Sequence, residues 1–451
     1  AHQLSLLTRR TYIQQIQAPA LPSSKVLAKQ LLAGLPFKMT HAQKRVSKEI
    51  ADDLKQNKPM LRLVQGDVGA GKTLVAGIAA CHALEADWQV ALMAPTEILA
   101  EQHYLNFKRW FEPLGLTVAW LSGKQKGKAR ALAEQQIQQG SAQLVIGTHA
   151  LFQDSVAFHK LGLVIIDEQH RFGVDQRLAL RNKGAQQTTP HQLVMTATPI
   201  PRTLAMSAYG DLDTSVIDEL PPGRTPIQTV TIPLDRREEV LQRIASNCAE
   251  GKQAYWVCTL VEQSETLDAQ AAEATYAEMK QRFPELNIGL VHGKMKADEK
   301  QTVMQQFKDN ELQLLIATTV IEVGVDVPNA SIMVIENAER LGLSQLHQLR
   351  GRVGRGAKAS FCALLYKNPL SQNGQERLRI MRETNDGFII AEKDLEIRGP
   401  GELLGTKQTG DMGFRVAKLE RDDHLLGEAH HVAQQILKDY PENVEPLLKR
   451  W

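Results

Sequence analysis

The chain has 451 residues, a length that favours two or three domains, because single domains usually have about 100 to 200 residues. Lys and Arg number 53 against 51 acidic residues, so the net charge of +2 shows no global excess for a polyanionic partner, and any such site must be local. The four scattered cysteines form no CxxC pair, which argues against disulfides and zinc, and no apolar run reaches the roughly 18 residues of a membrane span. We expect a soluble protein of a reducing cytoplasm, and a first residue other than Met suggests a trimmed product.

Residues 1–36 carry a helical pattern of leucines that Pro19 and Pro22 interrupt. The segment is too short for a domain, so we expect a connector that packs on another part of the protein. Phe37 and Gln43 follow, near the start of an expected helix that runs to about Lys55. A glutamine at such an entry can read adenine through its amide. An exposed glutamine on an ordinary helix is the alternative, which residue statistics favour, and only the phosphate-binding pattern about thirty residues later supports the adenine contact.

The stretch Gly66-Asp67-Val68-Gly69-Ala70-Gly71-Lys72-Thr73 lies between an apolar run and a segment with helical spacing. Its GxxxxGKT pattern at a strand-to-helix turn is typical of a phosphate loop. The glycines let backbone N–H groups face an anion, Lys72 reaches the β and γ phosphates, and Thr73 offers a hydroxyl to Mg²⁺. A glycine-rich turn with an incidental lysine is the alternative. The complete pattern favours binding of a nucleoside triphosphate.

Strand-like runs then alternate with helical segments, and this alternation predicts an α/β fold with a mostly parallel sheet. The runs are 90–93, 118–121, 144–146, 163–166 and 193–195. Polar turns follow four of them, at 94–97, 147–149, 167–170 and 196–198. Ligands collect at the carboxyl ends of the strands in such sheets, so four polar turns there indicate a site.

Asp167 and Glu168 follow the apolar run 163–166. An aspartate there can hold Mg²⁺ through water, and the adjacent glutamate can polarise the water that attacks a phosphoryl group. A lone Asp-Glu pair at a strand end is more often a capped turn. Downstream of a phosphate loop in the same sheet, the catalytic interpretation is favoured.

A Pro-rich stretch at 220–226 indicates a domain boundary, after which the alternation restarts without a second phosphate loop. We expect strands at 254–260, 288–291, 314–317, 332–335 and 361–366, and helices at 265–282 and 296–308. This second set contributes Arg352 and Arg355, which would share a face on a helical turn. Either could act as an arginine finger on the γ phosphate, and a contact with a phosphate backbone is the alternative.

Four threonines at strand ends could hold successive phosphates of a nucleic-acid strand, together with backbone N–H groups near Gly147 and Gly324. They are Thr96, Thr148, Thr318 and Thr319. Each alone is an ordinary turn or cap residue. His170 and His149 have no partners at metal-ligand spacing, which argues against a metal site at either histidine. His170 either couples the water-activating loop to the domain interface or is a hydrogen-bonded core histidine.

The C-terminal part begins with an expected helix at 375–393, rich in Arg and Glu. Residues 397–410 are too glycine-rich for regular structure and indicate a long loop of the kind usually kept for function. A last helix at 422–438 and a polar tail follow.

Taken together, these residues resemble a superfamily 2 helicase. The matching stretches are Gln43, the phosphate loop, the APTE turn, the box Asp167-Glu168-Gln169-His170, the turn Thr196-Ala197-Thr198, the segment from Thr318 to Asp326, and Gln348 to Arg355. Three stretches are similar to the RecG branched-DNA translocases more specifically: the DEQH box followed by RFG, GTHALFQ at 147–153, and DLEIRGPGELLGTKQTG at 394–410. The resemblance covers residues 37–420.

The resemblance implies two tandem RecA-like (P-loop NTPase) lobes with parallel sheets, followed by a helical hairpin and loop that serve translocation. The expected parts are connector helices, 1–36; an ATP-binding lobe, 37–222; a second lobe, 223–366; the translocation motif, 367–415; and a C-terminal helix and tail, 416–451. It also implies roles for Asp326 in nucleotide binding, for His170, Thr196 and Thr198 at the DNA, and for Arg377, Arg398 and Gln408 in coupling domain closure to movement.

The implied function is ATP-dependent, 3′ to 5′ movement on duplex DNA, with reversal of stalled forks and branch migration of Holliday junctions. ATP and Mg²⁺ are the implied cofactors, and DNA forks, junctions and duplex arms the partners, with single-strand DNA-binding protein as a further candidate. We expect a monomer in the bacterial cytoplasm, at the nucleoid, with no membrane partner. RecG proteins also carry an N-terminal wedge domain that residues 1–36 cannot form, so we expect a motor portion.

Three alternatives remain at the level of the sequence. The Mfd transcription-repair translocases share the motor and the coupling motif. An RNA helicase of the DEAD or DEAH type is disfavoured by the segment 375–410, which such enzymes do not need. A nucleotide-gated DNA-binding module without turnover is disfavoured because Lys72, Asp167, Glu168 and Arg355 are all present.

Overall fold

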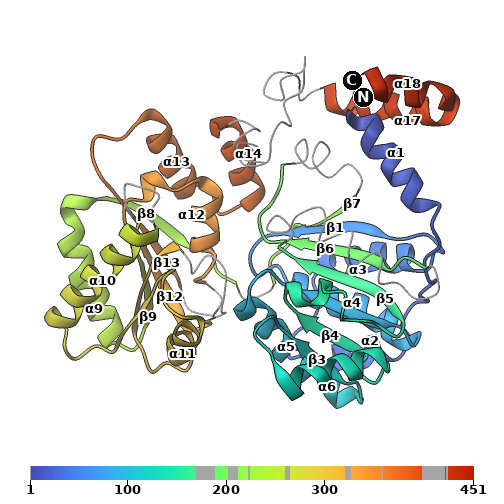
Figure 1. Cartoon of the computed structure of the whole chain (residues 1–451). Helices are drawn as coiled ribbons and strands as arrows, with labels where there is room; N and C mark the ends of the chain where they lie inside the picture. Colours follow the sequence, from blue (N-terminus) through green and yellow to red (C-terminus); the bar gives the residue numbers. More distant parts are fainter. Residues whose placement is uncertain are drawn as a thin grey trace. The chain divides into compact units, whose positions relative to one another are not determined.

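The computed structural model describes residues 2–168, 188–201, 212–221, 224–259, 265–319, 327–354, 356, 359–398, 422 and 425–450. The chain divides into two compact units (Figure 1). The first comprises residues 1–220 together with 399–451, and the second comprises residues 221–398.

The first unit is built on a seven-stranded sheet in the order β3-β4-β2-β5-β6-β1-β7, whose neighbouring strands run parallel. The strands are β1 (Leu61–Gly66), β2 (Gln89–Met93), β3 (Val118–Leu121), β4 (Leu144–Gly147), β5 (Leu161–Asp167), β6 (His191–Thr196) and β7 (Asp213–Ile217). Strand β7 pairs with β1 at the edge of the sheet. The sequence analysis did not predict it, because only two of its five residues are apolar and they form no continuous apolar run.

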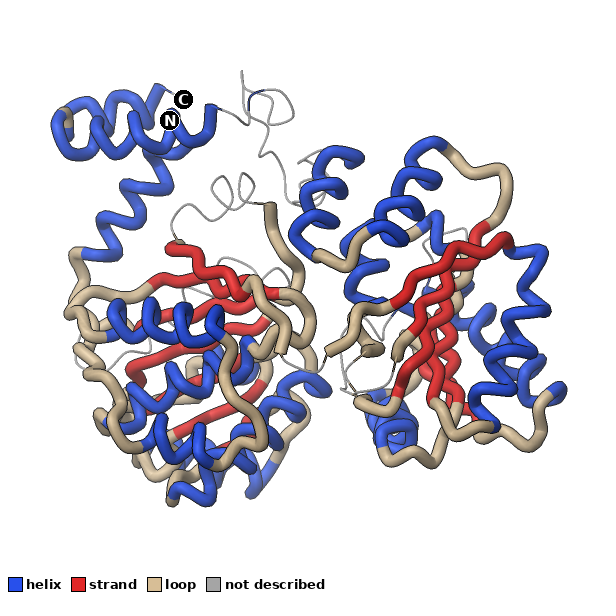
Figure 2. The backbone as a smooth tube through the Cα atoms, turned by 180° about the vertical axis from the view of Figure 1, so that it is seen from behind, coloured by secondary structure: helices blue, strands red, loops and turns tan. Residues whose placement is uncertain are grey.

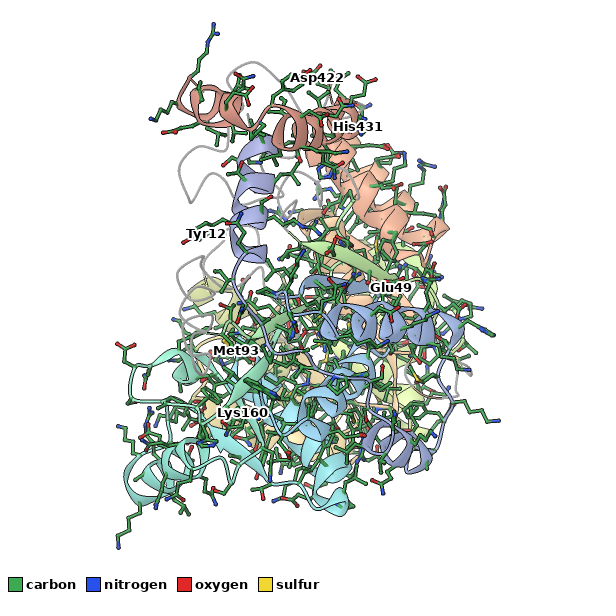
Figure 3. The ribbon with its side chains drawn as sticks, turned by 90° about the vertical axis from the view of Figure 1, so that its right-hand side faces the viewer. Tyr12, Glu49, Met93, Lys160, Asp422 and His431 are labelled. Carbon is green, nitrogen blue, oxygen red and sulfur yellow. The ribbon has the colours of Figure 1, made fainter. Side chains whose placement is uncertain are left out.

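Helices cover both faces of this sheet (Figure 2). They are α2 (Leu27–Ala33), α3 (His41–Leu54), α4 (Lys72–Glu85), α5 (Glu97–Phe111) and α6 (Gly127–Gln138), with short 3₁₀ turns η1 (Glu112–Leu114) and η2 (His149–Phe152). Successive residues of a strand belong to the hydrophobic cores on opposite faces of the sheet. Ile165 belongs to the core formed with α3, α4 and α5, whereas Ile166 belongs to the core that includes residues of α6. Met93 on β2 lies inside the unit (Figure 3) and is fully buried. This two-sided burial explains why the strands read as continuous apolar runs.

The N-terminal segment belongs to the first unit. Helix α1 (His2–Gln14) packs against α17 (Leu426–Asp439) and α18 (Val444–Arg450), which brings the two ends of the chain together (Figure 1). Tyr12 points outward from α1 (Figure 3) and is 69% exposed. The prediction of a polar tail was wrong, because Val444, Leu447 and Leu448 have helical spacing and pack with α1, after the 3₁₀ turn η8 (Pro441–Asn443).

The second unit is a six-stranded parallel sheet in the order β10-β11-β9-β12-β13-β8. Its strands are β8 (Gln228–Pro233), β9 (Gln253–Val257), β10 (Ile288–Val291), β11 (Leu314–Ala317), β12 (Ala330–Ile335) and β13 (Phe361–Tyr366). Its helices are α9 (Arg237–Ala249), α10 (Glu265–Arg282), α11 (Ala297–Lys308) and α12 (Leu343–Arg350), with 3₁₀ turns η4 (Leu234–Arg236) and η6 (Ala338–Arg340). Separate cores on the two faces repeat the plan of the first unit and confirm the expected fold class.

The single helix expected at 375–393 is two helices, α13 (Gln372–Glu383) and α14 (Gly387–Arg398). The break lies at Thr384-Asn385-Asp386. The Asp386 carboxylate accepts hydrogen bonds from the backbone N–H of Phe388 at 2.8 Å and of Ile389 at 3.4 Å, so it satisfies N–H groups at the start of α14. The sequence prediction was wrong because these three residues favour a cap over helix continuation.

The four cysteines are free, in agreement with the spacing that argued against disulfides, and all four are buried. Burial raises the pKa of Cys81 and of Cys362 to about 12. These thiols are therefore structural and unreactive at neutral pH. In the part of the chain that the structure describes, no helix is long and apolar enough to cross a membrane.

Candidate nucleotide-binding site

The phosphate-loop stretch joins the carboxyl end of β1 to the first residue of α4. Gly69 and Gly71 have φ angles of +79° and +85°, in the left-handed region that glycine adopts readily. A Cβ atom added at Gly71 would also collide with the Gln43 amide nitrogen. The strand-to-helix position expected from the sequence is confirmed. The backbone conformation explains why glycine stands at positions 69 and 71.

Lys72 is 9% exposed and folds its ammonium group back over the loop. Its Nζ donates to the carbonyl oxygen of Gly66 at 2.5 Å and of Asp67 at 3.0 Å. The Asp67 carboxylate in turn accepts from the backbone N–H of Val68 at 2.6 Å. Thr73 is half-buried in the first turn of α4. Lys72 and Thr73 are the first two residues of α4, so the lysine charge, the hydroxyl and the helix N-terminus come from one short stretch of chain, a combination that suits an anion.

Gln43 holds this loop from α3. It is 2% exposed, so the alternative of an ordinary surface glutamine is wrong. Its Oε1 accepts from the backbone N–H of Thr40 at 3.0 Å in a capping box, and its Nε2 donates to the carbonyl oxygen of Ala70 at 2.9 Å. Both amide atoms are therefore engaged with the protein. Phe37, which precedes this helix, is 51% exposed. The adenine contact of these residues stays a prediction.

Asp167 and Glu168 stand at the carboxyl end of β5, with β6 between β5 and the phosphate-loop strand β1. Asp167 is 8% exposed, and both of its carboxylate oxygens accept hydrogen bonds: Oδ1 from the backbone N–H of Glu168 at 3.1 Å, and Oδ2 from Nε2 of His103 at 2.7 Å. Sequence reasoning missed His103, because a histidine on the apolar stripe of a helix has no pattern that distinguishes it from a core residue.

Glu168 is held in an unusual backbone conformation, with a φ of +53°. Its N–H donates to the carbonyl oxygen of Met195 at 3.0 Å, and its Oε1 accepts from the backbone N–H of Ala197 at 3.2 Å. The structure therefore brings the acid pair together with the turn after β6. Within that turn the Oγ1 of Thr196 accepts from the N–H of Thr198 at 3.2 Å.

The threonines at the other strand ends have mainly local contacts. Thr96 caps α5, since its Oγ1 accepts from the N–H of Leu99 at 3.3 Å. Thr148, after β4, is 2% exposed, and its hydroxyl is buried without a hydrogen-bond partner among the described residues. Thr318, after β11, is 3% exposed, whereas Thr319 is half-buried. Contacts from these hydroxyls to DNA stay predictions, and for Thr148 they require its turn to open.

Arg352 lies beyond the end of α12, in a turn where its N–H donates to the carbonyl oxygen of Leu349 at 3.0 Å. The expectation that it shares a helical face with Arg355 stays a prediction, because Arg355 lies outside the described residues. Gly324 and four residues with predicted side-chain roles lie outside the described residues, as does the side chain of Arg398, the last residue of α14. The four residues are Asp326, His170, Arg355 and Gln408.

Arg377 on α13 ties the helical hairpin to the second unit. Its Nη1 donates to the carbonyl oxygen of Leu341 at 2.8 Å, just before α12, and its Nε donates to that of Asn373 at 3.2 Å. Asp394 on α14 accepts from the Ser344 hydroxyl at 2.7 Å and from the first N–H groups of α12. Both helices of the hairpin are therefore anchored to the segment that leads to Gln348 and Arg352.

Comparisons with known proteins agree with this architecture. Three family models match the chain: DEAD/DEAH box helicase at residues 40–207, helicase conserved C-terminal domain at 236–357, and ATP-dependent DNA helicase RecG, domain 3, C-terminal, at 384–449. The ATP-dependent DNA helicase RecG of Escherichia coli (strain K12) is 63% identical over the whole chain, which spans 65% of that protein. The chain belongs to the RecG family.

Other relatives agree. RecG of Haemophilus influenzae is 60% identical over the whole chain, which again spans 65% of the relative. A solved structure of RecG bound to a three-way DNA junction is 44% identical and superimposes with a TM-score of 0.76, over 94% of this chain and 55% of that one. Yeast Dbp5 bound to RNA and ADP BeF3 has a TM-score of 0.61 at 16% identity, which shows a shared fold alone. The match of the RecG-specific C-terminal model also favours RecG over the Mfd alternative.

Proposed function

We propose that this chain is the motor portion of a RecG-type, ATP-dependent DNA helicase that translocates 3′ to 5′ on duplex DNA at branches. The observation that carries the proposal is the phosphate loop and the Asp167–Glu168 pair on one sheet, in a chain that is 63% identical throughout to a protein named an ATP-dependent DNA helicase. Reversal of stalled forks and branch migration of Holliday junctions are the reactions that this motor would drive.

ATP would be held at the loop between β1 and α4, with its phosphates near Lys72 and the N–H groups of residues 69–73. To reach the phosphates, the lysine would exchange its bonds with the Gly66 and Asp67 carbonyls for bonds to phosphate oxygens. We assign Gln43, with Phe37, to the adenine side of the same site. Nucleotide binding would then be linked to the position of α3, because the Gln43 amide on α3 is hydrogen-bonded to Ala70 of the phosphate loop.

The oxygen donors present fit Mg²⁺, a hard cation that prefers carboxylate, hydroxyl and water ligands. Thr73 and Asp167 would hold it, the latter partly through water. When bound, the ion would neutralise charge on the phosphates. The described residues contain no group of three or more His, Cys, Asp or Glu that could hold a metal ion, so phosphate oxygens and water would have to supply most of its ligands.

Glu168 would polarise the attacking water, and its position is fixed by the N–H of Ala197. Arg352 and Arg355 would stabilise charge on the transferred phosphoryl group, and Asp326 would contact the nucleotide. We assign DNA contact to Thr96, Thr148, His170, Thr196, Thr198, Thr318 and Thr319. We assign coupling between hydrolysis and movement to Arg377, Arg398 and Gln408, and the anchoring of Arg377 to Leu341 supports this assignment.

We retain the parts proposed from the sequence, namely 1–36, 37–222, 223–366, 367–415 and 416–451. DNA is the proposed partner, with single-strand DNA-binding protein as a candidate, and the proposed state is a monomer at the bacterial nucleoid.

The steady-state rate of ATP hydrolysis tests the function. We expect strong stimulation by linear and forked duplex DNA and none by structured RNA. The stimulation should fall with salt, because binding to the phosphate backbone releases counterions. Stimulation by RNA alone would refute the assignment. ATP binding without turnover on any nucleic acid would favour the binding module.

A further inference from the structure

His103 is the seventh residue of α5 and lies on the buried stripe of that helix with Ala100, Phe107 and Phe111. Its ring meets the Phe107 ring edge to face, with centroids 6.4 Å apart and an interplanar angle of 77°. Phe107 also stacks on Phe111, and both phenyl rings are fully buried. The imidazole is therefore held by core packing, and at 5% exposure it has little freedom to change its rotamer.

The polar contact of this ring is directed at Asp167. The distance from Nε2 to Oδ2 is 2.7 Å, which is in the range of a strong hydrogen bond to an ionised acceptor. Since a carboxylate only accepts, Nε2 carries the hydrogen. Nδ1 is buried with no hydrogen-bond partner in the described part of the chain.

A purely structural histidine looks different in this same protein. His191 is fully buried and uses both ring nitrogens to join backbone segments: its Nδ1 accepts from the N–H of Met60 at 3.0 Å, and its Nε2 donates to the carbonyl oxygen of Pro19 at 2.7 Å. Among the described residues, His103 is hydrogen-bonded to no backbone group, and its one hydrogen bond there goes to the carboxylate that we assign to the metal.

We propose that His103 is a positioning residue that orients the Asp167 carboxylate toward the metal–nucleotide complex. The inference rests on the proposed function. The N–H of Glu168, which is shared with the Met195 carbonyl oxygen, contacts Oδ1, and His103 holds Oδ2. The carboxylate is thus contacted from two sides while each oxygen keeps a lone pair for water or metal. Partners of this kind, which orient a ligand without touching the metal, typically contribute about 10- to 100-fold in metal affinity.

The test is the Mg²⁺ concentration that half-saturates binding of a fluorescent ATP analogue to the full chain, with binding in EDTA as the reference. We expect His103→Leu to raise this concentration about tenfold and to leave binding in EDTA unchanged. His103→Gln should restore the wild-type value within about twofold, because its amide N–H can reach Oδ2, whereas the shorter His103→Asn should not. If the leucine variant does not fold, the glutamine and asparagine variants decide.

The matched control is His82→Leu. His82 is also 5% exposed, but it lies on α4 and contacts the N-terminal segment, where its Nδ1 accepts from the N–H of Ser24 at 2.9 Å. This variant should lose thermal stability without a change in Mg²⁺ dependence. An unchanged Mg²⁺ dependence in the leucine and asparagine variants of His103, or an equal shift in the His82 control, would overturn the inference. A wild-type chain whose nucleotide binding ignores Mg²⁺ would also overturn it. Mg²⁺-dependent binding without DNA-stimulated hydrolysis would instead count against the proposed function alone.

Discussion

Single side chains in the first unit serve more than one partner, and Glu168 is the clearest case. Its backbone is held by Met195 and its carboxylate by the N–H of Ala197, so the side chain is placed before any substrate arrives. A glutamine would keep the same bond through its own Oε1 while losing the negative charge. The substitution therefore tests the negative charge of Glu168 separately from the position of its side chain.

We therefore expect Glu168→Gln to bind ATP as the wild type does and to lose at least about 100-fold in DNA-stimulated hydrolysis, since general-base assistance typically contributes that much. Binding of a fluorescent ATP analogue and the steady-state ATPase rate measure the two effects. Asp154→Asn, at an exposed position of the same unit, is the control and should change neither. Rapid hydrolysis by the glutamine variant would contradict the role assigned to Glu168.

The site shows what sequence patterns can and cannot find at the residue scale. The phosphate loop and Asp167 were placed correctly at their strand ends, because a motif is a local run of residues and strand ends follow from apolar runs. The bond from Gln43 to Ala70 and the bond from His103 to Asp167 join residues far apart in the sequence. No local pattern encodes such pairings, so Gln43 was given an exposed alternative and His103 was overlooked.

At the scale of elements, the N-terminal connector is fixed to the first unit by backbone hydrogen bonds and buried histidines. The N–H of Ala18 donates to the carbonyl oxygen of Asn57 at 3.0 Å, and that of Leu21 donates to the carbonyl oxygen of Leu54 at 2.7 Å. His191 on β6 adds the bonds to Met60 and Pro19 described above. Desolvation by burial lowers the pKa of His191 from 6.5 to about 4, so the native state favours the neutral ring.

This lowered pKa predicts a pH dependence of stability. The contribution of the neutral ring is fully present above about pH 6.5 and is lost as the pH falls toward about 4, because the unfolded chain takes up the proton first. The free energy of unfolding of the first unit should fall by up to roughly 3 kcal/mol over that window from this group. Urea unfolding at several pH values measures it. His191→Gln, which can keep both hydrogen bonds, should flatten the dependence, and equal slopes in both proteins would contradict the assignment.

Elements were predictable where the hydrophobic pattern was strong, and they were missed where another contact decided. The central strands β2, β5 and β12 were found because both of their faces are buried. Helix α18 was missed because its apolar positions are meaningful only against α1 and α17. The break between α13 and α14 depends on the Asp386 cap, a side-chain contact that competes with helix formation.

At the scale of the whole molecule, the two units differ in how the chain builds them. The first unit needs residues from both ends of the sequence, whereas the second is continuous, 221–398, and has its own cores on both faces of its sheet. The hairpin α13–α14 supplies part of one of those cores through Leu378, Met381 and Ile390. The second unit therefore needs the hairpin to complete one of its two hydrophobic cores.

Arg350 is one reason why removal of the hairpin should lower the stability of the second unit. It is 1% exposed on α12, and its Nη1 donates to the carbonyl oxygens of Met381 at 2.7 Å and Thr384 at 2.9 Å, at the end of α13. Without those two acceptors, the buried guanidinium keeps its bonds to the Thr229 hydroxyl and to Nδ1 of His347 but loses both bonds to the end of α13. A buried polar group that loses its acceptor typically costs about 1 to 3 kcal/mol, and more when it is charged.

We therefore expect a fragment of residues 221–398 to fold by itself and to unfold cooperatively on heating, whereas a fragment of residues 221–370, which lacks both hairpin helices, should be unfolded or molten. Near-ultraviolet circular dichroism and thermal unfolding distinguish these states. Arg350→Met in the longer fragment separates the two causes: it removes the buried charge but keeps the apolar contacts of α13 and α14, so it should retain a cooperative transition. A cooperative transition in the shorter fragment would show that the second unit does not depend on the hairpin, and would place the hairpin outside the folded core.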